Sequence, residues 1–185
     1  MKTYLSIVYI LFILVLSCKS ANSYSDEQIK RLETLIESKS YTIESDWARP
    51  QVTYAMQQVL NSGILPPGSG SGAISLIGNA NFLTISGDSI NAYLPYFGER
   101  QMPTGYGGSD SAIQLKGKLK DYTFEIEKNN SYLILFDAQN ETENFNISIV
   151  LFPNRKSEIR VNSASRFPIS YSGEVLSVKT NKTTI

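Results

Sequence analysis

Residues 91–108, NAYLPYFGERQMPTGYGG, concentrate the residue types that could bind a ligand. The candidate contacts are four aromatic side chains and one arginine: Tyr93, Tyr96, Phe97, Tyr106 and Arg100. The rings could line a groove, and the guanidinium could bind a carboxylate or phosphate or stack on a ring. A structural role is the alternative, because aromatic rings in a β protein also plug one end of a sheet or pack across strands. The sequence leaves both interpretations open.

Few residues remain that could catalyse a reaction. The chain has no histidine and a single cysteine, Cys18, which excludes serine–histidine and cysteine–histidine nucleophiles and histidine-ligated metals. The carboxylates Asp88, Asp110 and Asp137 are left, but a carboxylate-based hydrolase needs two acids that face one cleft. Sequence spacing does not establish such a pair. We therefore expect a protein that is not an enzyme and uses no cofactor or metal, with a carboxylate-based hydrolase as the distant alternative.

The N-terminal residues have the features of a targeting segment. Lys2 is followed by an apolar run over residues 4–16, which is too short to span a bilayer comfortably and is typical of a secretory signal peptide. The end of this run, VLSC, resembles the lipobox of bacterial lipoproteins, in which cleavage precedes the cysteine and the thiol receives diacylglycerol. An ordinary signal peptide with a chance cysteine is the alternative. We expect a signal peptide over residues 1–17, a lipidated tether over residues 18–25 that begins at Cys18, and one β-rich domain over residues 26–185.

The charge balance argues against a nucleic-acid partner. Removal of the leader takes away Lys2 and leaves 16 basic residues against 17 acidic ones. Such a chain offers no overall positive field for nucleic acid or for anionic lipid headgroups. Attachment to the membrane would therefore come from the acyl chains at Cys18.

Two helices are predicted before the strands begin. Ser25 and Gln28 fit a capping box, and Ile29, Leu32 and Ile36 share one stripe, which predicts a helix over Asp26–Ser38. A strand is expected over residues 41–47, broken by the Arg49-Pro50 pair. A short helix then follows in TYAMQQVLN, with Gly63 as the glycine that ends it.

From residue 73 onward the hydrophobic pattern has a period of two, which predicts short strands joined by tight turns. In the strand over residues 122–127, Tyr122, Phe124 and Ile126 are expected to face inward. The strand over 132–138 is apolar on both faces and is expected to be central. Strands are predicted over residues 73–77, 81–86, 89–94, 112–119, 122–127, 132–138, 145–152, 157–163, 167–173 and 174–179. We therefore expect a mainly β fold, an antiparallel meander that forms a sandwich or a barrel-like sheet, with an N-terminal α-helix.

Three stretches resemble a known family: TISGDSINAYLPYFGE, GYGGSDSAIQLKGKLKDY and VNSASRFPISYSGEV. They are similar to the family called domain of unknown function 4251, whose members are predominantly lipoproteins or secreted proteins of Bacteroidetes. Its most specific elements here are LPYFG (residues 94–98) and ISYSG (residues 169–173), and the chain is longer than the usual pattern between residues 50 and 72. The resemblance implies an all-β, mostly antiparallel domain with an N-terminal helix, and it implies no activity.

The resemblance also bears on modification and location. Asp88-Ser89-Ile90 and Asp110-Ser111-Ala112 look like the tripeptides that Bacteroidetes glycosylate, which makes Ser89 and Ser111 candidate O-glycosylation sites. No acidic cluster follows Cys18, and in Bacteroidetes such a cluster looks like a signal for surface export. We expect an outer-membrane lipoprotein that faces the periplasm, with surface display as the alternative. Its expected function is non-catalytic binding, either of an envelope protein or of a small apolar or glycan-like ligand.

Overall fold

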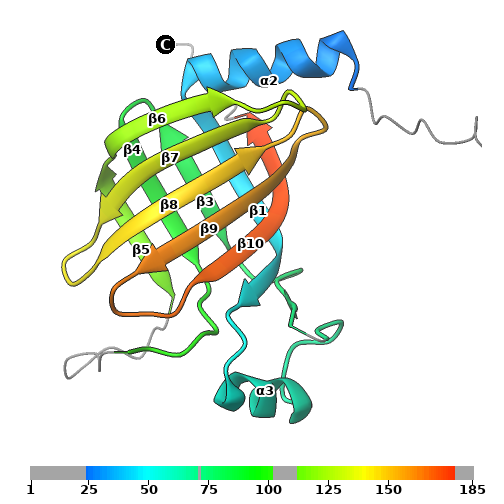
Figure 1. Cartoon of the computed structure of the whole chain (residues 1–185), viewed down its shortest axis with the longest axis vertical. Helices are drawn as coiled ribbons and strands as arrows, with labels where there is room; N and C mark the ends of the chain where they lie inside the picture. The colour runs from blue at the N-terminus through cyan, green and yellow to red at the C-terminus, as the bar shows by residue number, and fades with distance from the viewer. Residues whose placement is uncertain (1–23, 71, 102–111, 178–185) are drawn as a thin grey trace, which may run out of the picture.

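The computed structural model describes residues 24–70, 72–101 and 112–177, about half of which form a rolled antiparallel sheet (Figure 1). The ten strands are β1 (Ser40–Pro50), β2 (Ile74–Ser75), β3 (Phe82–Ser86), β4 (Ser89–Leu94), β5 (Ile113–Lys118), β6 (Lys120–Ile126), β7 (Tyr132–Gln139), β8 (Asn144–Leu151), β9 (Lys156–Ser163) and β10 (Ile169–Ser177). Their order is β5-β4-β3-β1-β10-β9-β8-β7-β6, and β2 pairs with β1.

The sheet rolls into a nearly closed barrel because its two end strands follow each other in the chain. Only Leu119 separates β5 from β6, although they stand at opposite ends of the strand order. Asn140 on the turn after β7 donates a hydrogen bond to the Gln114 carbonyl of β5 at 3.3 Å, across the line where the barrel closes. The expected mainly β, barrel-like antiparallel meander is confirmed.

Side chains fill the inside of the barrel. In β8 the alternate residues Phe145, Ile147, Ile149 and Leu151 are each at most 1% exposed. Large aromatic residues from other strands join the same core cluster, among them Tyr41, Phe136 and Tyr171.

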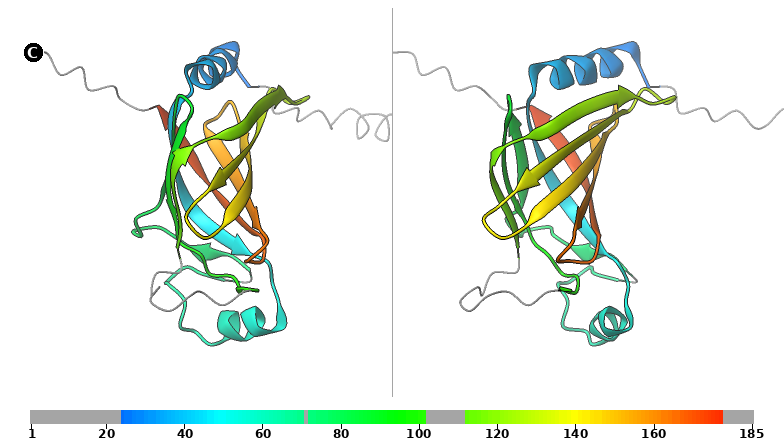
Figure 2. Two further views of the ribbon diagram at one scale, coloured as in Figure 1. Left: turned by 90° about the vertical axis from the view of Figure 1, so that its left-hand side faces the viewer. Right: turned by 60° about the vertical axis from the view of Figure 1, so that its left-hand side comes forward.

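The two helices lie at opposite ends of the barrel (Figures 1 and 2). Helix α2 (Asp26–Ser38) begins at the predicted capping box, in which Ser25 and Gln28 exchange hydrogen bonds, and it buries Leu32 and Ile36. Helix α3 (Tyr54–Asn61) is capped by Thr53 and buries Met56, and Gly63 follows it with φ of 72°. Both helices are confirmed at their predicted positions.

Strand β6 keeps its predicted orientation, but two of its inward side chains are exposed. Phe124 and Ile126 lie directly opposite Ile134 and Tyr132 of β7, whose side chains are buried, so they are on the same inner face of the sheet. Tyr122 is half-buried, whereas Phe124 is 48% exposed and Ile126 is 63% exposed. Strand β6 is the last strand of the order and has only β7 beside it, which leaves its side chains less covered than those of the inner strands.

The last strand corrects another boundary. The segments predicted as two strands, 167–173 and 174–179, form the single strand β10, and Gly173 lies inside it. A Cβ atom on Gly173 would lie 2.0 Å from the carbonyl oxygen of Glu44, beside a bulge between Ser45 and Trp47 of β1. This glycine therefore permits a close approach of two backbones and does not make a turn.

Three smaller boundaries also differ from the sequence expectation. Strand β1 continues through Arg49 and ends at Pro50, where the proline no longer needs to donate to the ladder. Strand β2 is only two residues long. Strand β7 is not central but lies next to the end strand β6, and its second apolar face leaves Leu135 38% exposed.

Candidate functional site

Tyr96 is buried at the end of the barrel where β4 stops. It is 4% exposed, and its hydroxyl donates to the Glu99 carbonyl oxygen at 2.7 Å, with the Phe167 carbonyl oxygen also in reach at 3.0 Å. The ring folds back over Gly98, because a Cβ atom there would lie 2.5 Å from the tyrosine oxygen. The LPYFG sequence is thus explained by a tyrosine that folds back on a residue without a side chain.

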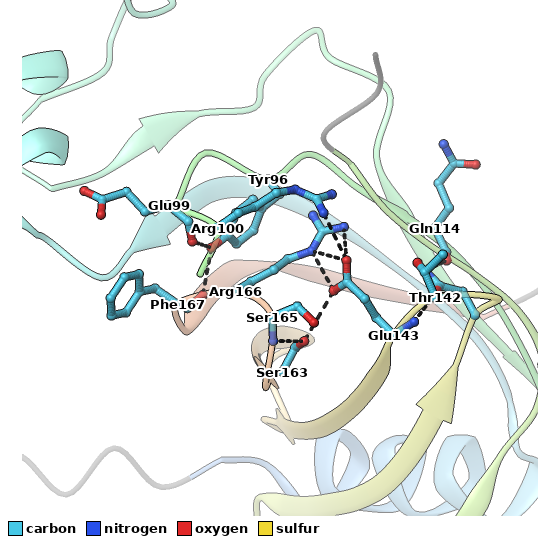
Figure 3. A network of polar contacts seen from close by, with 11 residues as sticks. Tyr96, Glu99, Arg100, Gln114, Thr142, Glu143, Ser163, Ser165, Arg166 and Phe167 are labelled. Atoms are coloured by element: carbon cyan, nitrogen blue, oxygen red, sulfur yellow. Dashed lines mark hydrogen bonds and ion pairs between the residues drawn. The ribbon is translucent and has the colours of Figure 1, made fainter. Parts of the chain in front are cut away.

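Beside Tyr96, two arginines converge on one buried carboxylate (Figure 3). Arg166 donates to Glu143 Oε2 through Nε at 2.9 Å and to Oε1 through Nη2 at 2.9 Å, and the side chains of both residues are 5% exposed. Arg100 adds an ion pair at 3.1 Å with 23% of its side chain exposed. The Arg166 guanidinium also stacks over the Tyr96 ring at 4.9 Å from its centroid. We call Tyr96, Arg100, Glu143 and Arg166 the Glu143 cluster.

Backbone hydrogen bonds hold the two segments of the cluster together. Phe167 N donates to the Glu99 carbonyl at 3.1 Å, and Gln101 N donates to the Ser165 carbonyl at 2.9 Å. These bonds flank a bridge between Arg100 and Arg166, so the segment after β4 pairs with the segment before β10. The cluster therefore closes one end of the barrel by joining strands that are far apart in sequence.

The electrostatics of the cluster favour a fixed charge over proton transfer. Burial alone would raise the pKa of Glu143, but the hydrogen bonds and charge of Arg166, with the charge of Arg100, outweigh it and hold that pKa below its usual value. Burial raises the pKa of Tyr96, although Arg166 offsets part of the effect. A general acid or base works best with a pKa near the working pH. Both groups are shifted away from that range.

A groove of about 840 Å³ lies on the outer face of the barrel, over β1, β10, β9 and β8. Its floor follows β10, where Ser170, Ser172 and Gly173 have small side chains or none. One wall is formed by Trp47 and Arg49 of β1, which stand opposite Ser172 and Ser170 in the ladder. The other wall consists of Lys156, Glu158 and Arg160 of β9.

The family of the chain follows from its sequence as a whole. The model of the family called domain of unknown function (DUF4251) matches residues 24–175. The chain belongs to this family. The crystal structure of a DUF4251 family protein from Bacteroides eggerthii has the same fold, with a TM-score of 0.54 at 12% identity over 82% of this chain and 88% of that chain. No curated protein matches the chain.

In this DUF4251 domain, the predicted ligand residues do not surround one cavity. Tyr96 and Arg100 belong to the Glu143 cluster, whereas Tyr93 is half-buried on the outer face of β4 opposite Phe82. Phe97 is half-buried and packs against the core. None of these four described residues lines the groove over β10. Tyr106 lies outside the described residues.

The other candidate residues are placed as follows. Ser89 is exposed and is the first residue of β4, directly after the hairpin turn. Asp137 faces outward and accepts a hydrogen bond from Asn146 Nδ2 at 2.9 Å, which supplies the partner that this carboxylate needs. Cys18, Ser111 and Asp110 lie outside the described residues.

Sequence reasoning missed Glu143 and Arg166. Arg166 lies within one of the stretches that carry the family resemblance, but nothing in its spacing links it to Glu143 or Arg100. Glu143 sits in the turn before β8, where an acidic residue is ordinarily a solvated turn residue. Only the strand order of the barrel brings the three together.

The described part of the chain shows neither a group of metal-ligating side chains nor a helix that could span a membrane. Its acidic residues form no group of three or more that could hold a metal ion. Within the same ranges, neither helix has the length and apolar character of a bilayer span.

Proposed function

We propose that this chain is a lipid-anchored, non-catalytic binding module of the bacterial envelope, attached to the outer membrane through Cys18 and facing the periplasm. The lipobox-like VLSC sequence supports the anchor. Helix α2 begins at Asp26, eight positions after Cys18 in the sequence, and the residues between them are mostly small and polar, as a tether would require.

The groove over β10 is the observation that carries the binding proposal. The interior of the barrel is filled by side chains, and the polar atoms of the Glu143 cluster bind one another. The outer groove instead presents side chains of several chemical kinds around a floor without bulky groups. These observations support a ligand site on the outside of the sheet.

The lining of the groove favours a polar, glycan-like ligand over an apolar one. The ladder places Arg49, Ser170 and Arg160 in one row across the strands, and Trp47, Ser172 and Glu158 in the next. Binding sites for small molecules combine apolar contact area with a few polar groups that fix orientation. Here the Trp47 ring supplies the apolar face, and hydroxyl, guanidinium and carboxylate groups surround it.

Native mass spectrometry of residues 21–185, purified from the envelope of the host, tests this proposal. Wild type is expected to retain a bound small molecule. Ser172→Trp fills the floor of the groove and is expected to lose it, whereas Asn91→Trp, on the outer face of β4, is expected to keep it. A wild-type domain without any adduct, or an adduct that survives Ser172→Trp, would contradict the assignment to the groove.

Metabolic fatty-acid labelling tests the anchor separately. Wild type is expected to incorporate label, and Cys18→Ala is expected to lose it, because this is the only thiol in the chain. Equal labelling of the two chains would rule out lipidation at Cys18 without touching the proposal for the groove.

A further inference from the structure

Helix α3, at the end of the barrel opposite α2, belongs to a segment without any charge. Residues 50–87 contain no aspartate, glutamate, lysine or arginine. Since 18% of the whole chain is charged, a segment of this length would ordinarily hold about seven such residues. The segment includes α3 and the loops on either side of it, which project from the barrel at that end (Figure 1).

Large apolar side chains of this segment are exposed. Val52 is 50% exposed, Tyr54 is 82% exposed and Ile64 is 77% exposed. Val59 on α3 adds a further partly exposed side chain at 36%, while Met56 of the same helix is buried at 4%. We call Val52, Tyr54, Val59 and Ile64 the uncharged end. Single exposed apolar residues are normal, but a group of them with no charge among them is typical of an interaction surface.

The uncharged end is held in place by the segments that follow β4 and precede β10. The Thr53 hydroxyl caps α3 by accepting from Met56 N at 3.1 Å, and it also donates to a carboxylate oxygen of Glu99. Gln51 N donates to the Pro168 carbonyl at 3.0 Å. Glu99 and Pro168 are next in sequence to residues on either side of the Glu143 cluster, so these hydrogen bonds fix the position of α3 on the barrel. A surface that is already ordered loses less conformational entropy when it binds.

We infer that the uncharged end is a self-association surface and that its occupant is a second copy of this chain. If the partner carried charged residues in the contact, binding would remove those charges from water. The uncharged end has no opposite charge to pair with them, so this desolvation would cost free energy. A second copy presents the same uncharged residues. A two-fold contact between the two copies therefore buries no unpaired charge and brings no like charges together. Two-fold dimers are built in this way, from one patch that is complementary to itself. The inference is independent of the groove and of the lipid anchor.

The exposed apolar residues of β6 lack this character. On β6, Phe124 and Ile126 are 48% and 63% exposed, but Lys120, Asp121 and Glu125 lie on the same strand. Charges on an end strand oppose its pairing with another chain. This contrast supplies a matched control, because Ile64 and Ile126 are the same residue type and are both largely exposed.

Analytical ultracentrifugation of residues 19–185 over a range of concentrations tests the inference. Every buried core residue of the described part lies between Leu32 and Val175, so the fold does not draw on the leader. Wild type is expected to form a reversible dimer. Ile64→Lys is expected to raise the dimer dissociation constant by about tenfold or more, since it buries unpaired like charges in the contact. Ile126→Lys is expected to leave that constant unchanged.

Tyr54→Lys serves as a second substitution on the uncharged end, and far-ultraviolet circular dichroism checks that each variant is folded. It is expected to weaken the dimer as Ile64→Lys does. The inference is overturned if wild type stays monomeric at every concentration. It is equally overturned by a dimer that both uncharged-end variants leave intact, or by one that Ile126→Lys disrupts.

Discussion

Replacing Glu143 by glutamine should expose how much the buried cluster contributes to stability. Glu143→Gln keeps the size of the side chain but removes the negative charge that lies between Arg100 and Arg166. Because Glu143 and Arg166 each have only 5% of their side chain exposed, solvent screens their interaction little. Breaking a buried pair of this kind costs about 3–5 kcal/mol, chiefly because one charge stays buried without its partner. For a domain of this length, that loss lowers Tm by about 6–20 °C.

Urea unfolding followed by circular dichroism measures the effect, and two variants serve as controls. Arg100→Gln removes the partner that is 23% exposed and should cost about 1 kcal/mol, because solvent screens this pair more strongly. Glu141→Gln changes an exposed acid two positions away and should leave the free energy of unfolding within about 0.5 kcal/mol of wild type. If Glu143→Gln were as stable as Glu141→Gln, the proposed role of the cluster would be wrong.

The pH dependence gives the same experiment a second readout. The folded pKa of Glu143 is held below its ordinary value of 4.5, so folding favours the ionised form. Its contribution to the free energy of unfolding is therefore full above pH 4.5 and declines as the pH falls through the lower folded pKa. The difference between wild type and Glu143→Gln should shrink over that acidic range. A difference that stays constant down to the acid transition would show that charge is not its cause.

Three further substitutions test the local geometry by the same unfolding measurement. Gly98→Ala places a Cβ atom 2.5 Å from the Tyr96 oxygen and should cost about 1–3 kcal/mol, whereas Gly117→Ala meets nothing within 4 Å and should cost nothing measurable. Gly173→Ala should lower the free energy of unfolding more than Gly98→Ala does. Its Cβ atom would lie 2.0 Å from the β1 backbone, which cannot move aside as a side chain can. Equal losses of stability would contradict this close approach of the two backbones. Tyr171→Phe removes the hydrogen bond that its hydroxyl donates to the Pro95 carbonyl at 2.9 Å and should cost about 1–2 kcal/mol, and an unchanged stability would show that water replaces it.

Local patterns predicted those elements whose neighbours are near in sequence. The capping box at Ser25 gave the start of α2, and the alternating pattern gave the strand β8, because both signals depend only on residues a few positions apart. The strand break predicted after Gly173 was wrong, since the role of this glycine depends on a bulge in β1 more than a hundred residues earlier. The exposure of Phe124 likewise depends on the place of β6 at the end of the strand order.

The same distinction explains the candidate site. The sequence singled out Tyr96 and Arg100 because aromatic rings and an arginine stand close together, and the structure does bring these two residues into one cluster. Their partners Glu143 and Arg166 could not be predicted, because the contacts arise only when the strand order closes one end of the barrel. The residue types thus indicated that Tyr96 and Arg100 form a distinctive site, but they did not indicate the role of that site in closing the barrel.

The residues that carry the family resemblance at LPYFG make their contacts inside the fold and not with the surroundings of the protein. The LPYFG residues bury Tyr96 against the segment before β10, and their polar atoms bind other parts of the same chain. Residues 50–70, where the sequence analysis expects extra length relative to the family pattern, are joined to this part of the fold by the hydrogen bond between Thr53 and Glu99. A loop that is anchored on a rigid scaffold can change its exposed residues without loss of the fold. Differences in binding between members should therefore be sought on such loops and on the outer face of the sheet, and not at the residues that define the family.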